Sequence, residues 1–397
     1  MSNCFPRWVR PLTTGGLAAL VLWLCLPHQL SARELQLDVD PFYAESVLKG
    51  AFGSKPVYFF IGPSPLMEKA VVAFIESAQK SLDVCVFDLD LPEFADAFLA
   101  AHARGVKVRI LLHNANAEKA YPIIEQLRTM KAEGILTLVN NKSGLMHNKF
   151  MVADGESVWT GSYNLTRNGS RFNDNHVIVL ESPQLAYNYT REWQEIAEGR
   201  HGKRLAYPTP YPRVTIGTVE IHNLFTPEDD VRAAMVDVID KAKSEIAIMA
   251  YSFTDGAMVE AIDRAVKRGV RVIIVLDTDM SSHPTAKTRE LRATGASVRL
   301  SPGILLHHKV IVADREIVVL GSANFSQAAF EKNDENVLII KSPTFAGAMI
   351  RETQRVWRAE PYSITKWRTR LPTSAGTVAP SVSADPTSSG PTAPGFR

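Results

Sequence analysis

The amino-acid sequence predicts an α/β protein made of two pseudo-symmetric α/β sandwich halves. Each half is expected to hold a mostly parallel or mixed sheet flanked by helices, with the functional site at the interface. Three observations lead to this prediction. The spacing H-x-K-x4-D-x6-G-S-x-N occurs twice, 160 residues apart. Segments with strand and helix periodicity surround both copies in the same order. Strands that alternate with helices favour a sheet covered on both faces.

The elements of the first half can be followed along the chain. Residues 65–80 carry apolar side chains on one helical face, and an apolar strand over 82–87 follows. A helix in FADAFLAAHARG, the strands VKVRILL, HNKFMVAD, SVWTGS and VIVLE, and the helix LAYNYTREWQEI complete the set. The second half repeats it with a helix over 228–243, strand EIAIMAY, a helix over 256–268, and strands VRVIIVL, HHKVIVAD, EIVVLGS and VLIIK before the helix FAGAMIRETQRVW.

Composition shifts set the expected boundaries. A stretch with Pro208, Pro210 and Pro212 is typical of a linker, and a Pro, Ser, Thr and Gly-rich C-terminus is typical of a disordered tail. The expected segments are a signal peptide (1–32), the first half (33–200), a linker (201–218), the second half (219–370) and the tail (371–397).

The N-terminus has the pattern of a secretory leader. Arg7 and Arg10 precede an apolar run over 17–26, and Ser31-Ala32 offers a cleavage site. The run is about half of the roughly 20 residues that a bilayer span needs, so export to the periplasm or medium is favoured over a permanent anchor.

Composition and charge exclude little but limit the partners. The chain is 46% hydrophobic and 22% charged, and 44 basic against 42 acidic residues give a net charge of +2. No global field therefore draws the protein onto nucleic acid or an anionic membrane, although a local basic groove is compatible with this balance. Only Cys85 remains after the leader, in an apolar strand, so we expect a core residue and no internal disulfide.

The repeated motif is suited to binding and attacking one phosphate. His147 and Lys149 lie two apart on a predicted strand and project to the same face, and the second copy matches them. Glycine allows a tight bend, after which Ser and Asn offer hydrogen bonds to phosphate oxygens. If the halves pack about a pseudo-twofold axis, both sets converge on one site. The candidate residues are His147 and His307 as catalytic groups, and Lys149, Lys309, Asn164, Asn324, Ser162 and Ser322 as phosphate-binding groups.

Two full copies of H-x-K-x4-D with a downstream G-S-x-N resemble the phospholipase D superfamily, over roughly residues 56–200 and 219–358. The resemblance implies a phosphodiesterase that forms a covalent phosphohistidine without a metal. One histidine attacks phosphorus, and the other protonates the leaving oxygen and then activates water.

The resemblance also implies an acidic residue eleven positions after the motif asparagine, where it orients a catalytic histidine. Glu335 occupies this position in the second half, but Asn175 stands there in the first. An amide can orient an imidazole but cannot stabilise its positive charge as a carboxylate does. We therefore expect His147 to be the nucleophile, with Glu335 reaching across to it and Asn175 serving His307.

Other motif residues have a different expected role. Asp154 and Asp314 should be structural, bound to a backbone or basic group at the domain interface, because four residues separate them from the lysines. Beyond the predicted leader, the other histidines are expected to be ordinary core or surface residues; they are His102, His113, His176, His201, His222, His283 and His308.

We expect no cofactor and no catalytic metal, because the sequence contains no H-E-x-x-H motif, no clustered cysteines and no Walker loop. The expected partner is a phosphodiester, either phospholipid or nucleic acid. After leader removal we expect a monomer without a stable membrane span.

Several functions share this chemistry. A phospholipid head-group hydrolase is the leading hypothesis, and a nuclease of the same superfamily is the first alternative. A phosphatidyltransferase such as a cardiolipin synthase passes the same intermediate to an alcohol, and a non-catalytic scaffold normally loses a motif His or Lys. A lipase should show an apolar rim around the pocket, and a nuclease a basic, aromatic-lined groove.

Overall fold

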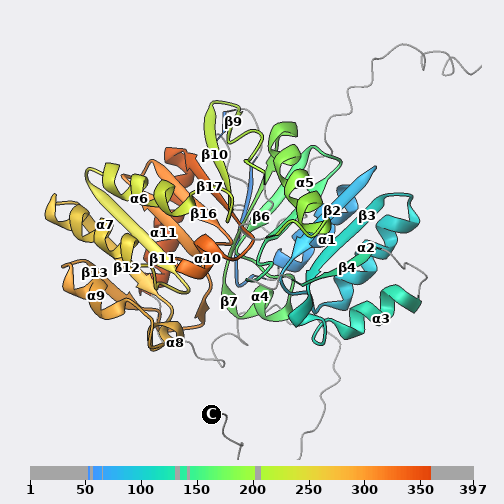
Figure 1. Cartoon of the computed structure of the whole chain (residues 1–397), viewed down its shortest axis with the longest axis horizontal. Helices are drawn as coiled ribbons and strands as arrows, with labels where there is room; N and C mark the ends of the chain where they lie inside the picture. Colours follow the sequence, from blue (N-terminus) through green and yellow to red (C-terminus); the bar gives the residue numbers. More distant parts are fainter. Residues whose placement is uncertain are drawn as a thin grey trace, which may run out of the picture.

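The computed structural model describes residues 52–53, 57–64, 66–129, 135–140, 144–201 and 207–358. Two α/β halves lie side by side, and each contains one mixed sheet (Figure 1). The predicted signal peptide (1–32) and tail (371–397) lie outside the described residues. In the described part of the chain, no helix is both long and apolar enough to span a bilayer.

The first half is built on a seven-stranded sheet. In spatial order its strands are β1 (Tyr58–Ile61), β8 (His176–Glu181), β6 (Ser157–Gly161), β5 (Lys149–Ala153), β2 (Ser81–Val86), β3 (Lys107–His113) and β4 (Leu136–Val139). The β2/β3 and β3/β4 pairs are parallel and the other pairs antiparallel, so the sheet is mixed. Its helices are α1 (Leu66–Ser77), α2 (Pro92–Ala103), the 3-10 turn η2 (Asn114–Asn116), α3 (Tyr121–Thr129), α4 (Arg167–Arg171) and α5 (Pro183–Ala197).

The second half repeats this plan on an eight-stranded sheet. In spatial order its strands are β13 (Ser297–Leu300), β12 (Arg271–Leu276), β11 (Glu245–Ala250), β15 (Lys309–Ala313), β16 (Ile317–Gly321), β17 (Glu335–Lys341), β10 (Val219–Thr226) and β9 (Arg213–Ile216). Its helices are α6 (Val231–Lys241), α7 (Gly256–Lys267), α8 (Thr278–Ser281), α9 (Thr288–Ala293), α10 (Gln327–Glu331) and α11 (Pro343–Arg358). Strand β9 pairs with β10, so the C-terminal part of the expected linker is an edge strand of this sheet.

Helix starts follow ordinary capping chemistry in both halves. Ser182 accepts a hydrogen bond from the backbone N–H of Leu185, and Asp255 does the same for Met258. The hydroxyls of Thr166 and Ser326 cap the matching short helices α4 and α10. Equivalent local sequences therefore begin equivalent helices.

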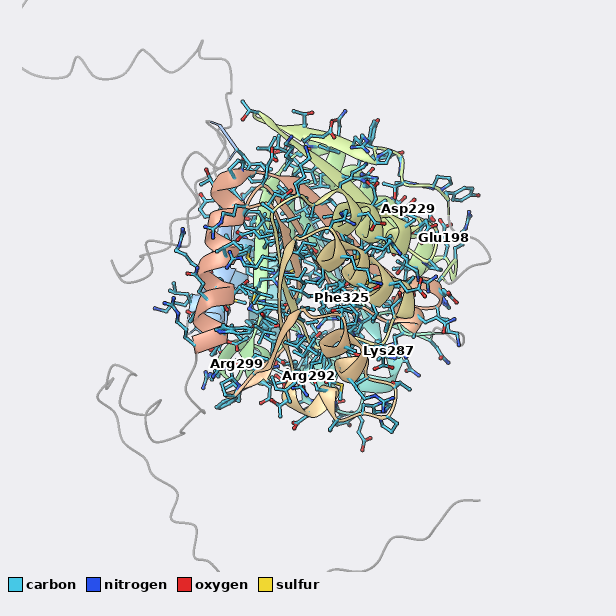
Figure 2. The ribbon with its side chains drawn as sticks, turned by 90° about the vertical axis from the view of Figure 1, so that its left-hand side faces the viewer. Glu198, Asp229, Lys287, Arg292, Arg299 and Phe325 are labelled. Atoms are coloured by element: carbon cyan, nitrogen blue, oxygen red, sulfur yellow. The ribbon has the colours of Figure 1, made fainter. Side chains whose placement is uncertain are left out.

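Three apolar cores hold the layers together. Two outer cores lie within single halves, whereas the third contains buried residues from both sheets together with α5 and α11. Phe59 of β1 meets Phe345 of α11 edge-on at 5.0 Å between ring centroids, and Tyr189 of α5 meets Phe225 of β10 at the same distance. The two halves thus share a core. In the second half, Phe325 lies inside, whereas Arg292 and Arg299 lie toward the lower surface (Figure 2).

Candidate active site

Two short backbone pairings cross between the halves and bring the repeated motifs together. Strand β14 (Leu305–Leu306) pairs in parallel with β7 (Asn173–Asp174) of the first half, and Met146 forms a matching bridge with Asp334. The N–H of His147 donates to the Asp334 carbonyl at 2.9 Å, and that of His307 donates to the Asp174 carbonyl at 2.9 Å. Each motif histidine is therefore fixed beside the chain of the opposite half.

The side chain of each motif histidine also contacts a residue of the opposite half. His147 Nδ1 lies 2.7 Å from Glu335 Oε2, and His307 Nδ1 lies 2.8 Å from Asn175 Oδ1. Because a carboxylate and an amide oxygen only accept, both imidazoles donate from Nδ1 and keep Nε2 for other chemistry. Asn333 donates to the other carboxylate oxygen of Glu335 at 3.0 Å and fixes its orientation.

Burial controls the charge of both histidines. Burial lowers the pKa of His147 to about 4, and the Glu335 carboxylate opposes that change. Burial also holds the pKa of His307 well below its usual value, and the nearby lysines Lys309 and Lys149 add to the effect. A bound anion would raise both pKa values, because it favours the charged form of each ring.

Lys149 and Lys309 supply the positive charge of the site. Each side chain is 2% exposed, and each ammonium donates to the carbonyl of the histidine two residues earlier, at 2.5 and 2.9 Å. Burial lowers the pKa of Lys149 to about 7 and that of Lys309 well below its usual range. Neither lysine forms an ion pair with a carboxylate of the described chain. Two buried ammonium groups without such partners suit an anionic ligand.

The Gly-Ser-x-Asn turns are shaped by close backbone contact. Gly161 has φ +153°, and a Cβ there would lie 2.2 Å from the His176 carbonyl oxygen; Gly321 repeats this at 2.1 Å from the Asn336 oxygen. Only glycine allows such an approach. The side-chain amides of Asn164 and Asn324 have buried Oδ1 atoms without a hydrogen-bond partner among the described residues. Because an amide oxygen only accepts, a phosphate oxygen would be bound by the Nδ2 donors of these two amides and not by the unpaired Oδ1 atoms.

The turn serines form hydrogen bonds to the strand that follows each turn. The Ser162 hydroxyl donates to Asn175 Oδ1 at 2.9 Å and accepts from the His176 N–H. The Ser322 hydroxyl accepts from the Asn336 N–H at 3.0 Å. Both serines are fully buried. Their hydroxyls bind the neighbouring strand, and direct contact of either serine with phosphate stays a prediction.

Asp154 and Asp314 lie at the far ends of their strands. The Asp154 carboxylate accepts from the backbone N–H groups of Gln79, Lys80 and Ser81, and Asp314 accepts from those of Lys243, Ser244 and Glu245. The expected backbone partners are present, but they belong to the same half. The expected place at the domain interface is wrong, because these strands run away from it.

Two aromatic residues complete the site and were not among the sequence candidates. Phe87 meets the His147 ring edge-on at 4.7 Å between centroids, and Tyr251 meets His307 in the same way at 4.9 Å. Each follows a matching strand by one residue. Alignment of SLDVCVF with EIAIMAY would have revealed them, since both segments end on an aromatic residue.

Two further histidines line the interface beside the site. His176 Nδ1 lies 3.0 Å from His308 Nδ1, and His308 Nε2 lies 2.9 Å from Glu352. The residues that correspond to His176 and His308 in the repeat are Asn336 and Asn148, and Asn336 donates to Asn148 at 2.9 Å. Both pairs are buried and join the halves, so the expectation of ordinary core residues fits the contacts of His176 and His308. Among the described residues, no three His, Cys, Asp or Glu side chains are grouped to hold a metal ion.

Comparison with known proteins identifies the family. The model of the "Cardiolipin synthase, PLD-like domain" family matches residues 71–197 and 235–357, together more than half of the chain. The chain belongs to the phospholipase D superfamily.

Several similar proteins have names that refer to lipid substrates or products. A mitochondrial cardiolipin hydrolase of Xenopus tropicalis is 29% identical over 47% of this chain and 91% of its own length. A phospholipase D of Rickettsia conorii is 34% identical over 33% of this chain and 66% of its own length. The solved phosphatidylserine synthase of Haemophilus influenzae matches 77% of this chain and 86% of its own, with a TM-score of 0.61 and 15% identity, which shows the shared fold. The cardiolipin hydrolase and the phospholipase D support phosphodiester chemistry for this phospholipase D family member.

Proposed function

We propose that this protein is an exported phospholipase D-type hydrolase that cleaves a phospholipid head group through a covalent phosphohistidine. One observation carries the proposal: two imidazoles, each oriented from the opposite half, share a buried site with two lysines. Such a site offers a nucleophile, a proton donor and positive charge to one phosphodiester.

The geometry gives each group a role. His147 donates from Nδ1 to Glu335 and attacks phosphorus with Nε2, while the P–O bond to the leaving alcohol breaks. His307, protonated once the anionic diester is bound, gives its Nε2 proton to the leaving oxygen. The neutral His307 then takes a proton from water, whose oxygen displaces His147 from phosphorus. Lys149, Lys309 and the Nδ2 donors of Asn164 and Asn324 hold the non-bridging oxygens.

Glu335 supports His147 as the nucleophile. A phosphohistidine intermediate leaves the imidazole with positive charge, which a carboxylate stabilises better than an amide. The Glu335 pKa is lowered despite burial, because His147 and Lys149 favour the ionised carboxylate. Asn175 offers His307 orientation only, which suits a ring that gains and loses a proton.

Apolar groups beside the site support a lipid substrate. Leu145 and Phe172 are both 38% exposed, and they lie on the two segments that cross between the halves. Leu305, partly exposed, pairs with Asn173 next to Phe172. Exposed apolar side chains near a polar site suit a lipid surface more than a nucleic-acid backbone. The lipid-related names of the relatives support the same substrate class.

One assay series tests this proposal. The mature protein is offered phosphatidylcholine, phosphatidylglycerol, single- and double-stranded DNA, RNA and a p-nitrophenyl phosphodiester, all with chelator. We expect lipid turnover, and loss of turnover in His147→Ala and His307→Ala but not in the exposed control His283→Ala. Preferred cleavage of DNA or RNA would select the nuclease alternative, and a dominant transfer product with added alcohol would select the transferase.

A trapping experiment tests the assignment of the histidines. The p-nitrophenyl leaving group needs little protonation, so His307→Ala should form the intermediate and hydrolyse it slowly. We expect label from the substrate to accumulate on His147 in that variant. Label on His307 in His147→Ala, with none in the converse variant, would reverse the assignment. N-terminal sequencing of the exported protein would test cleavage after Ala32.

A further inference from the structure

Phe87 and Tyr251 stand in the same relation to both catalytic groups of their own half. The Lys149 ammonium lies 5.0 Å from the centroid of the Phe87 ring, and the Lys309 ammonium lies 4.9 Å from that of Tyr251. The same rings contact His147 and His307 edge-on. Both halves have this arrangement although the aromatic residue differs, so we treat it as a feature of the site.

The Phe87 ring is held firmly in place. It stacks on His113, with 5.1 Å between centroids and 20° between planes. The backbone carbonyl of Phe87 accepts a hydrogen bond from the Asn116 side-chain amide at 2.7 Å. The ring therefore has one position against the lysine.

Each lysine needs this contact because the protein gives it few others. An ammonium group has three N–H donors, and one is used on the histidine carbonyl. Glu335 and Asp88 favour a charged Lys149, while burial opposes it. Glu335 and Asp277 favour a charged Lys309, while burial and Lys149 oppose it. An aromatic face attracts a desolvated cation most strongly where water cannot.

We propose that Phe87 and Tyr251 are positioning residues that keep the two phosphate-binding lysines charged and aimed at the site, while their ring edges fix the catalytic imidazoles. The proposal rests on the proposed function only for the identity of the anion. It assigns the ring face, rather than the Tyr251 hydroxyl, as the active element.

The test follows the lysines directly by NMR. Protein labelled with ¹³C at lysine Cε is titrated, and Lys149→Arg and Lys309→Arg identify the two resonances. Phe87→Leu should lower the titration midpoint of Lys149 by about one pH unit, and Tyr251→Leu should do the same for Lys309. Tyr251→Phe keeps the ring and should leave Lys309 unchanged.

Two controls separate this role from general packing. Phe74→Leu removes a buried ring that packs on Trp159 in the same half, and should leave both midpoints unchanged. Phe87→Met keeps an apolar side chain of similar volume without a ring, and should behave as Phe87→Leu does. Calorimetry with inorganic phosphate should show roughly tenfold weaker binding in both Phe87 variants.

Unchanged midpoints in Phe87→Leu and Tyr251→Leu would overturn the proposal. A shift in Tyr251→Phe as large as that in Tyr251→Leu would also overturn it, since the hydroxyl would then be responsible. Failure of the wild-type protein to hydrolyse any phosphodiester would contradict the proposed function but leave the NMR result decisive for this inference.

Discussion

At the scale of single residues, the two halves differ most where they orient the catalytic imidazoles. Glu335 gives His147 a carboxylate partner, whereas Asn175 gives His307 a neutral one. The surrounding contacts are similar in the two halves. The Ser162 hydroxyl donates to Asn175, and the Ser322 hydroxyl accepts from the N–H of Asn336, which follows Glu335. One change of side chain therefore separates the expected nucleophile from the expected acid.

Asn175→Asp should move the pH profile of turnover. A carboxylate beside His307 favours its charged form and raises a pKa that burial and two lysines now hold low. A general acid works only when protonated, so activity falls as pH rises through its pKa. The alkaline limb of kcat/KM should therefore shift to higher pH. Asn336→Asp, which touches Asn148 and no catalytic ring, serves as the control, and an equal shift there would contradict the assignment.

Glu335→Gln should lower kcat by about 10- to 100-fold, because the amide still orients His147 but no longer stabilises its positive charge. The effect should appear in the rate of phosphoenzyme formation, measured as the burst of p-nitrophenol. A variant with an unchanged burst and slower release of product would show that Glu335 acts in the second step instead.

At the scale of elements, the turns opposite the site set the register of the motif strands. Asp154 and Asp314 have φ values of 57° and 52°, and each carboxylate binds three successive backbone N–H groups of a helix-to-strand turn. They thereby tie β5 to the start of β2 and β15 to the start of β11. The strand that carries each lysine is fixed from its distant end.

Asp154→Ala should destabilise the fold by about 1 to 3 kcal/mol, since three N–H groups lose a charged acceptor. Urea denaturation should report the loss, while kcat at 25 °C should stay near the wild-type value. Asp154→Asn, which keeps one acceptor oxygen and tolerates the positive φ, should lie between the two. A large fall in kcat without loss of stability would place Asp154 in the chemistry.

The sequence predicted the elements better than their pairing. Periodicity located the strands that carry Lys149 and Lys309, and repetition located the two turns. The crossing through β7 and β14 involves strands of two residues, too short for any pattern to reveal. Strand β9 was hidden within a proline-rich stretch. The burial of the two turn serines could not be predicted from the sequence, because it depends on how closely Gly161 and Gly321 approach the next strand.

At the scale of the whole molecule, the two halves form one packing unit. The shared core joins α5 and α11 to both sheets, and Arg355 of α11 binds Asp174 of the first half. The Asn148–Asn336 and His176–His308 pairs add polar contacts across the same interface. Since the His147–Glu335 and His307–Asn175 pairs also cross this interface, the site exists only while the halves are docked.

Unfolding should therefore be one cooperative transition in which activity is lost together with secondary structure. Circular dichroism, tryptophan fluorescence and turnover, followed along one urea series, should give the same midpoint. Phe345→Ala, which removes a buried interface ring, should move all three midpoints together by the same amount. Separate midpoints, with activity lost first, would show that the halves undock before they unfold.

The crossed dyads also bear on how such a chain can diverge. In an assembly of two identical copies, any replacement of an orienting carboxylate would alter both catalytic rings at once. In a single chain each half can change alone, as the pairing of Asn175 with His307 and of Glu335 with His147 illustrates. A protein with this architecture can use one imidazole as the nucleophile and the other for proton transfer.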